Sequence, residues 1–176
     1  MAKNLLITKK IKELLKNKNL TGYKLSKIIG ISDGSMYAMI RGQAEFPADK
    51  IQKIAALMEV PSDEIKGWIL ADKYPQNILK RAIEVKQEVK PDAGMLILTA
   101  KIDNYLQQKG LSRTALSKVI GYSQGKLNEM IKGVEPISPL VISKIAPVLG
   151  VSEDEIISWV IADKYSVEAL RVALEC

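Results

Sequence analysis

Apolar residues recur three and four positions apart along this chain, which is the period of an amphipathic helix and not the alternation of a strand. The first such face consists of Ile7, Ile11, Leu14 and Leu15. Similar faces continue to about residue 84, and they predict six helices, the last starting near Pro75. Gly30 and Gly42 are predicted to end the second and third of these helices.

Hydroxyl side chains stand where several of these helices are predicted to begin. Thr21 precedes the second apolar face, Ser32 the third and Ser62 the fifth. Because a serine or threonine oxygen accepts a hydrogen bond from the first helical turn, we predict that all three are N-caps.

The helical pattern is written twice. Residues 7–84 align with residues 98–175 without a gap, and about 32 of the aligned positions are identical. The clearest pair of segments is WILADKY (68–74) and WVIADKY (159–165). Two copies are too few for a solenoid array, so the repeat predicts a duplicated domain.

The helical pattern and the duplication together predict an all-α protein of two tandem domains, each of five to six helices. The domains are predicted at residues 1–84 and 98–176. Residues 85–97 between them are polar and contain Pro91 and Gly94, as is typical of a linker. A linker of this length extends to roughly 40 Å.

Within each copy, residues at fixed positions meet the demands of a helix-turn-helix. The second helix needs a small residue near the turn, and the turn needs a residue that tolerates positive φ. Ser26 and Gly30 meet these demands in the first copy, and Ser117 and Gly121 meet them in the second.

The segment after the turn carries a further pattern, FPADKIQKIAALMEVPSDEI (46–65) in the first copy and ISPLVISKIAPVLGVSEDEI (137–156) in the second. With the glycine turn, it makes each copy resemble the phage-repressor-like (Xre/Cro-repressor type) helix-turn-helix domain. The resemblance implies binding to double-stranded DNA, with the third helix as recognition helix. Members commonly carry glutamine at the start of the second helix, where this chain has Gly22 and Arg113.

The resemblance also implies which side chains meet DNA. For base readout it implies Ser32, Asp33, Ser35, Tyr37, Arg41, Ser123, Gln124, Lys126, Asn128 and Lys132. For the DNA backbone it implies Lys9, Lys10, Thr21, Lys24, Lys27, Ser112 and Arg113. Since the two readout sets differ, we expect two dissimilar half-sites and no perfect palindrome.

Charge is distributed unevenly between the halves. The net charge is +6, yet residues 1–90 hold 17 Lys and Arg against 10 Asp and Glu, and residues 91–176 hold 9 against 10. The first copy is therefore expected to supply most of the electrostatic attraction to phosphate.

Several kinds of chemistry lack their residues. The chain has no histidine, and its single cysteine is Cys176. We find no nucleotide-binding loop or zinc motif, so no catalytic residue, metal, cofactor or small-molecule ligand is predicted, and the protein is not expected to be an enzyme. No apolar run is long enough to span a membrane and no signal peptide is evident, which favours a cytoplasmic, nucleoid-associated protein.

The WILADKY segments lie outside the shared pattern. Trp68 and Trp159 are predicted to pack inside their domains, and Asp72 and Asp163 to lie at solvated helix ends.

The sequence thus favours sequence-specific binding of double-stranded DNA by a repressor-like transcriptional regulator with two recognition helices in one chain. A protein-interaction adaptor, or an antitoxin- or inhibitor-like partner built on the same domains, is the alternative. A single chain acting as a pseudo-dimer and a homodimer of whole chains both remain open.

Overall fold

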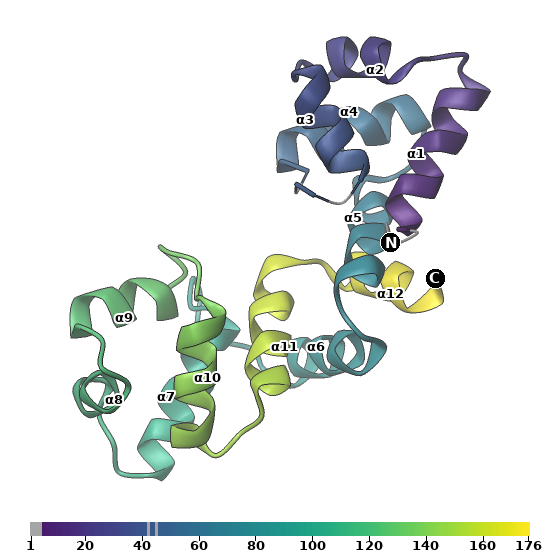
Figure 1. The fold of residues 1–176 in the computed structure, drawn as a ribbon. Helices are drawn as coiled ribbons and strands as arrows, with labels where there is room; N and C mark the ends of the chain where they lie inside the picture. The colour runs from purple at the N-terminus through teal and green to yellow at the C-terminus, as the bar shows by residue number, and fades with distance from the viewer. Residues whose placement is uncertain (1–4, 42, 45) are drawn as a thin grey trace. The chain divides into compact units, whose positions relative to one another are not determined.

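The computed structural model describes residues 5–41, 43–44 and 46–176, and the regular structure in these ranges is entirely helical (Figure 1). The helices are α1 (Leu6–Asn17), α2 (Gly22–Ile29), α3 (Asp33–Ile40), α4 (Ala48–Met58), α5 (Ser62–Lys73), α6 (Gln76–Glu88), α7 (Ile97–Gln108), α8 (Arg113–Ile120), α9 (Gln124–Ile131), α10 (Pro139–Leu149), α11 (Glu153–Lys164) and α12 (Val167–Glu175). The all-α prediction is confirmed.

Most of the predicted helix caps are present. Thr21 accepts a hydrogen bond from the Lys24 amide at 3.2 Å, and Ser32 accepts one from the Ser35 amide at 3.1 Å. Gly30 ends α2 in the left-handed conformation, with φ 73°. The predicted stop at Gly42 lies outside the described residues, and α3 ends at Ile40.

The prediction that Ser62 caps α5 is wrong. Ser62 is the first residue of the helix, and the cap position before it is Pro61, whose side chain has no acceptor. The residue aligned with Pro61 in the second copy is Ser152, which accepts a hydrogen bond from the Glu155 amide at 3.1 Å. The cap positions of α5 and α11 therefore align, but of the two only α11 has a capping side chain there.

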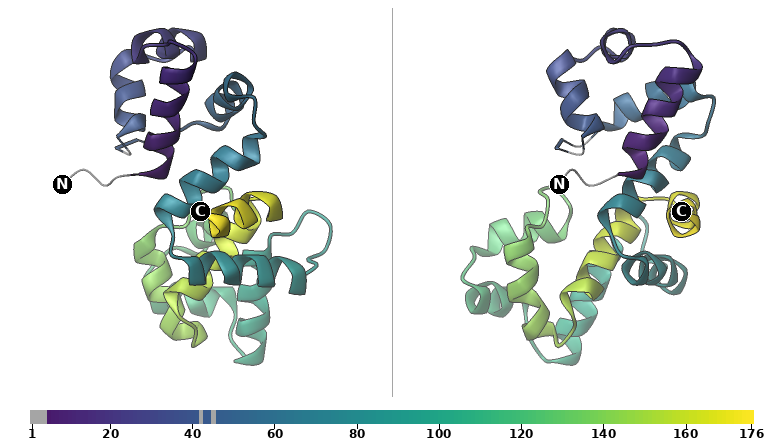
Figure 2. Two further views of the ribbon diagram at one scale, coloured as in Figure 1. Left: turned by 90° about the vertical axis from the view of Figure 1, so that its right-hand side faces the viewer. Right: turned by 45° about the vertical axis from the view of Figure 1, so that its right-hand side comes forward.

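The chain forms two compact units. Unit 1 contains residues 1–76 and 168–176, so α1–α5 are joined there by most of α12 (Figure 2). Its aliphatic core includes Ile11, Leu25, Met36 and Ile54, none of which is exposed, and Val172 of α12 packs against that core. Burying each such side chain contributes about 1.5–3 kcal/mol.

Unit 2 contains residues 77–167, and therefore most of α6 together with α7–α11. Trp159 of α11 is fully buried and stacks on Tyr105 of α7, with ring centroids 5.8 Å apart. Trp68, its counterpart in unit 1, is only 4% exposed. The prediction that both tryptophans pack inside their domains is confirmed.

The two units do not coincide with the two sequence copies, because each unit contains the sixth helix of the other copy. The chain passes from unit 1 to unit 2 at residues 76–77 and returns at 167–168, and it does not cross between units in the segment 85–97. Residues 85–88 of that expected linker form the end of α6, because Val85 continues the buried face of the helix. The connection between α6 and α7 lies inside unit 2.

Candidate nucleic-acid interface

Each copy contains two eight-residue helices joined by a tight turn, α2 with α3 and α8 with α9. The buried hydroxyl of Ser26 donates to the Tyr23 carbonyl oxygen at 2.7 Å, and that of Ser117 donates to the Thr114 carbonyl oxygen at 2.9 Å. A small side chain whose hydrogen bond is satisfied within its own helix can be buried beside the turn without cost to the fold.

In each copy, a lysine of the fourth helix lies at the C-terminal end of the second helix. Lys53 Nζ donates to the Ile29 carbonyl oxygen at 3.3 Å, and Lys144 Nζ donates to the Ile120 carbonyl oxygen at 2.9 Å. A cation at the C-terminal end of α2 or α8 opposes the negative end of the helix dipole. These two lysines align between the copies, and that coincidence was the available sequence signal for them.

The first turns of α3 and α9 are open to a ligand. Ser32 and Ser123 cap these helices, with the hydrogen bond from the Lys126 amide to Ser123 measuring 3.3 Å. A Cβ added at Gly34 or Gly125 would meet no other described part of the chain within 4 Å. Exposed amides at a helix start are suited to a phosphate or a base edge.

In the first copy, four of the five residues predicted to read bases are exposed. They are Ser32, Ser35, Tyr37 and Arg41. Asp33 is half-buried, and its carboxylate lies within hydrogen-bond distance of the Ser26 hydroxyl, whose single proton it shares with the Tyr23 carbonyl oxygen. The ring of Tyr37 lies against the start of α2, where a Cβ on Gly22 would be 3.1 Å from Tyr37 Oη.

In the second copy, the exposed members of the readout set are Ser123, Gln124, Lys126 and Lys132. Asn128 is half-buried, and its side-chain oxygen accepts a hydrogen bond from Arg113 Nη1 at 3.4 Å. Arg113 in turn donates to both carboxylate oxygens of Asp103, at 2.6 and 2.5 Å. These hydrogen bonds raise the pKa of the Arg113 guanidinium above its ordinary value. The structure therefore pairs Arg113, predicted to contact the DNA backbone, with protein groups.

The residues predicted to contact the DNA backbone from the first copy occupy different environments. Lys9, Lys24 and Lys27 are exposed, and Lys27 Nζ lies 5.1 Å from the centroid of the Tyr23 ring. Lys10 is half-buried, with its Nζ 5.3 Å from the Trp68 ring centroid, so its charge is already engaged with an aromatic face. Thr21 and Ser112 are exposed at the helix starts that they cap.

Three lysines on one side of α1 form the clearest cationic face. Lys9, Lys12 and Lys16 line a shallow hollow together with Thr8 and Glu13. The equivalent positions of the second copy hold Ala100, Asp103 and Gln107. The charge difference between the copies is therefore concentrated on the exposed side of the first helix.

The structure corrects the prediction for Asp72 and Asp163. Both carboxylates bind backbone amides at the start of the first helix of their copy, and neither lies at a merely solvated helix end. For Asp163, burial raises the pKa, and hydrogen bonds from the Leu98 and Ile97 amides oppose that rise. Sequence reasoning missed this role, although the aspartate occurs in both WILADKY-like segments.

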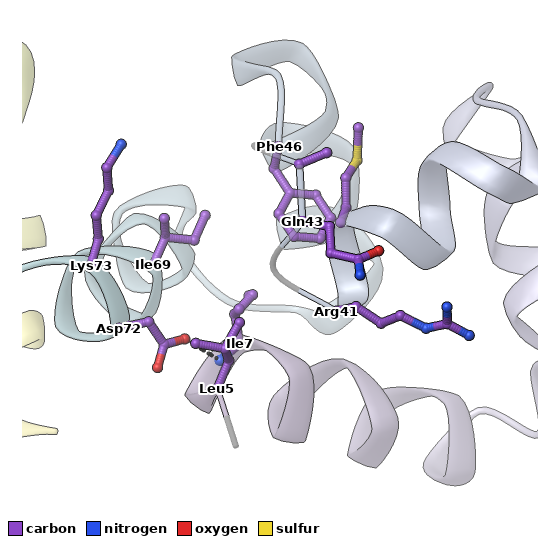
Figure 3. A pocket seen from close by; sticks show the side chains of 10 residues that line it. Leu5, Ile7, Arg41, Gln43, Phe46, Ile69, Asp72 and Lys73 are labelled. Atoms are coloured by element: carbon purple, nitrogen blue, oxygen red, sulfur yellow. Dashed lines mark hydrogen bonds between the residues drawn. The ribbon is translucent and has the colours of Figure 1, made fainter. Parts of the chain in front are cut away.

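A hollow of about 410 Å³ lies beside this contact in unit 1 (Figure 3). Its apolar lining includes Leu5, Ile7, Phe46 and Ile69. Figure 3 shows the hydrogen bond between Ile7 and Asp72 at its edge and the Arg41 side chain directed away from Asp72. Arg41 thus borders the hollow while its guanidinium group remains exposed.

The described residues contain no group of three His, Cys, Asp or Glu side chains arranged to hold a metal ion. None of the helices described is both long enough and apolar enough to cross a membrane.

Comparison with known protein families gives one match for each copy. Residues 11–65 match a family described as "Helix-turn-helix", and residues 101–162 match one described as "Cro/C1-type HTH DNA-binding domain". Each match contains the two helices and the turn described above. No curated protein and no solved structure matches the chain. The two matches support DNA binding and a role in transcription regulation.

Proposed function

Because this chain belongs through both of its copies to the Cro/C1-type helix-turn-helix family, we propose that it is a repressor-like regulator that binds specific sequences of double-stranded DNA with two recognition helices. The observation that carries the proposal is the duplicated start of the recognition helix. In both copies a serine cap and an unobstructed glycine leave the first turn of α3 or α9 open.

The side chains around these openings favour different bases. Gln124 of α9 is exposed and carries both a donor and an acceptor, as adenine requires in the major groove. Lys126 is exposed beside it and suits a guanine edge. The first copy instead offers the hydroxyls of Ser32 and Ser35 with the ring of Tyr37. We therefore propose a bipartite site with two unlike halves.

Affinity that is independent of sequence comes in this proposal mainly from α1. Its face of Lys9, Lys12 and Lys16 suits a run of phosphates, and each phosphate that a lysine neutralises contributes about 0.9 to the slope of log affinity against log salt. The second copy, which lacks these lysines, would contribute mainly sequence discrimination.

Binding should first be measured by fluorescence anisotropy on random duplex DNA over a salt series, followed by selection of bound sequences. A steep salt dependence and an enriched motif with two unlike halves are the expected results. The mass of the complex then shows whether one chain or a homodimer occupies the site. Absence of binding at low salt would contradict the proposal.

A matched pair of variants links the motif to α9. Gln124→Ala should lower affinity for the selected site by about 1–3 kcal/mol and leave affinity for random DNA unchanged. Gln107→Ala, at another exposed glutamine, on α7, serves as control and should change neither.

A second candidate function is supported by one repeated surface feature. Ile28 and Val119 occupy equivalent positions near the ends of α2 and α8, and they are 50% and 66% exposed. Exposed apolar side chains next to the turn suit a protein partner, as in an adaptor or an antitoxin-like protein. Failure of DNA binding together with capture of a defined protein, lost in Ile28→Ser or Val119→Ser, would favour this candidate.

A further inference from the structure

The sixth helix of each copy belongs to the compact unit of the other copy. Residues 168–176 of α12 are part of unit 1, and residues 77–88 of α6 are part of unit 2. We call α6 and α12 the closing helices. Each unit thus consists of five helices from one copy and a closing helix from the other.

α12 approaches α5 closely at Gly67. A Cβ placed on Gly67 would lie 2.5 Å from Val172 Cγ1 and 2.9 Å from the carbonyl oxygen of Ala169. Both distances are shorter than the contacts that real side chains make, and one of the atoms belongs to the backbone of α12. The α5 surface can therefore accept α12 in this position only because residue 67 has no side chain.

The equivalent surface of α11 does not have this property. Ser158 stands where α5 has Gly67, and its fully buried hydroxyl donates to the Glu155 carbonyl oxygen at 2.6 Å. If α12 docked in the same way on α11, its own copy, the Ser158 side chain would overlap Val172 and the backbone at Ala169. Ser158 thus disfavours the packing of α12 on its own copy.

α6 buries an apolar face in unit 2 and adds contacts to α11 through long polar side chains, which require no such close approach. Arg81, the counterpart of Val172, donates to both Glu155 carboxylate oxygens at 2.9 Å. Lys86 Nζ donates to the carbonyl oxygen of Tyr165 at 2.9 Å and to that of Ala162, near the C-terminal end of α11. The two closing helices therefore present different chemistry to different surfaces.

The connections into the closing helices also favour exchange. Tyr74, between α5 and α6, has φ −125° and ψ 143°, and Tyr165, between α11 and α12, has φ −123° and ψ 150°. Pro75 disfavours helical backbone at Tyr74. Because both connections are short and extended, they do not form the tight turn that folds one helix back on the preceding one, and short hinges of this kind favour exchange of an element.

We propose that the α5 surface around Gly67 is a docking site for α12 of the same chain, and that Ser158 excludes α12 from the equivalent surface of α11, so that the two copies exchange their closing helices. The occupant of the site is a short helix with small and branched apolar residues, Ala169 and Val172, on its inner face. This proposal does not depend on DNA binding. It implies that neither copy completes its fold by itself.

Cysteine cross-linking on the full-length chain tests this exchange, because Cys176 is the single native thiol and follows α12 directly. Cys176 Sγ donates to the Val172 carbonyl oxygen at 3.0 Å, and Val172 packs against Gly67. Lys10 Nζ lies 5.3 Å from the ring centroid of Trp68, the residue after Gly67, so Lys10 and Cys176 both lie near this part of α5 in unit 1. Lys10→Cys supplies a partner thiol in unit 1. Lys101→Cys, at the equivalent position on α7, supplies the matched control in unit 2.

With a short bismaleimide, Lys10→Cys should form a cross-link within one chain roughly 10²-fold faster than Lys101→Cys, as expected for thiols held side by side. Adding Gly67→Ala should slow that reaction, whereas adding Ser158→Gly to Lys101→Cys should speed cross-linking of the latter, because α11 then admits α12. Preferential cross-linking of Lys101→Cys, equal rates for both variants, or cross-links formed only between chains would each overturn the proposal. The comparison of the two cysteine variants stands even if Gly67→Ala fails to fold.

Discussion

The carboxylate of Asp72 accepts a hydrogen bond from the backbone amide of Leu6 at 2.7 Å, across 66 residues of sequence. The amide of Ile7 donates to the same carboxylate at 3.0 Å. The contact recurs in the second copy, where Asp163 accepts from Ile97 at 2.7 Å and from Leu98 at 2.9 Å. Since Leu5 and Leu96 cannot cap α1 and α7 with their side chains, an aspartate from the fifth helix does so.

Loss of this cap should destabilise the first helix of either copy. We expect Asp72→Ala to lower the free energy of unfolding by about 1 kcal/mol, the typical contribution of a side-chain cap. Asp72→Asn, which keeps one acceptor oxygen, should cost less. Urea unfolding followed by circular dichroism measures both, and equal stability of the wild type and Asp72→Ala would contradict this role.

The pair formed by Arg81 and Glu155 should make stability depend on pH. The hydrogen bonds from Arg81 hold the pKa of Glu155 below its ordinary value of 4.5. The stabilisation is therefore present above that ordinary value and is lost as the pH falls through the lowered pKa of the folded state. Urea unfolding from neutral pH to below 4.5 should show this loss, and Glu155→Gln should reduce it.

A suitable control for the pH experiment is Glu153→Gln, an exposed residue of the same helix. Its unfolding curve should follow the wild type at every pH. If Glu155→Gln shows the same decrease as the wild type, the pair does not determine the acid sensitivity.

The lysine face of α1 should govern the salt dependence of DNA binding. Lys9→Ala and Lys16→Gln introduce the residues that the second copy carries at the equivalent positions, so the helix should be preserved. Together they should lower the salt slope by up to about 0.9 per lysine and weaken binding to selected and random DNA alike. Lys80→Ala, on the exposed side of α6, is the control, and a slope unchanged by the double variant would remove α1 from the interface.

The recognition surface of α9 should be transferable to α3. Asp33→Gln, Ser35→Lys, Tyr37→Asn and Arg41→Lys give α3 the predicted readout residues of α9, while Met36, Met39 and Ile40 keep its buried face. Gly22→Arg and Lys12→Asp add the groups that hold Asn128 in the second copy. Sequence selection should then return two similar half-sites. Persistence of two unlike halves would show that other residues read the bases.

The local features of the fold followed from the sequence because they depend on neighbouring residues. Hydroxyl residues before an apolar face, such as Thr21 and Ser32, have their capping partners three residues away. The turn glycines occupy the left-handed backbone that they were predicted to provide, with φ 73° at Gly30 and 71° at Gly121. Exposure of most of the predicted readout residues follows from the same periodicity.

Features that depend on distant pairing did not follow from the sequence. Asp72 could not be assigned to Leu6 because helical period fixes which face a residue occupies and leaves its partner helix undetermined. For the same reason the first domain was expected to extend to residue 84, whereas the first segment of unit 1 ends at residue 76. Periodicity identified α6 as a helix, but its partner depends on contacts such as Arg81 with Glu155, 74 residues apart.

The exchange of closing helices also affects how the protein folds during its synthesis on the ribosome. α5 is synthesised long before α12, since roughly 90 residues separate them, and at typical translation rates of about 5–20 residues per second the wait lasts about 5 to 20 s. During that interval the α5 surface around Gly67 is uncovered in the nascent chain. The first copy would then remain a target for chaperones until the second copy has emerged, although the first copy is synthesised first.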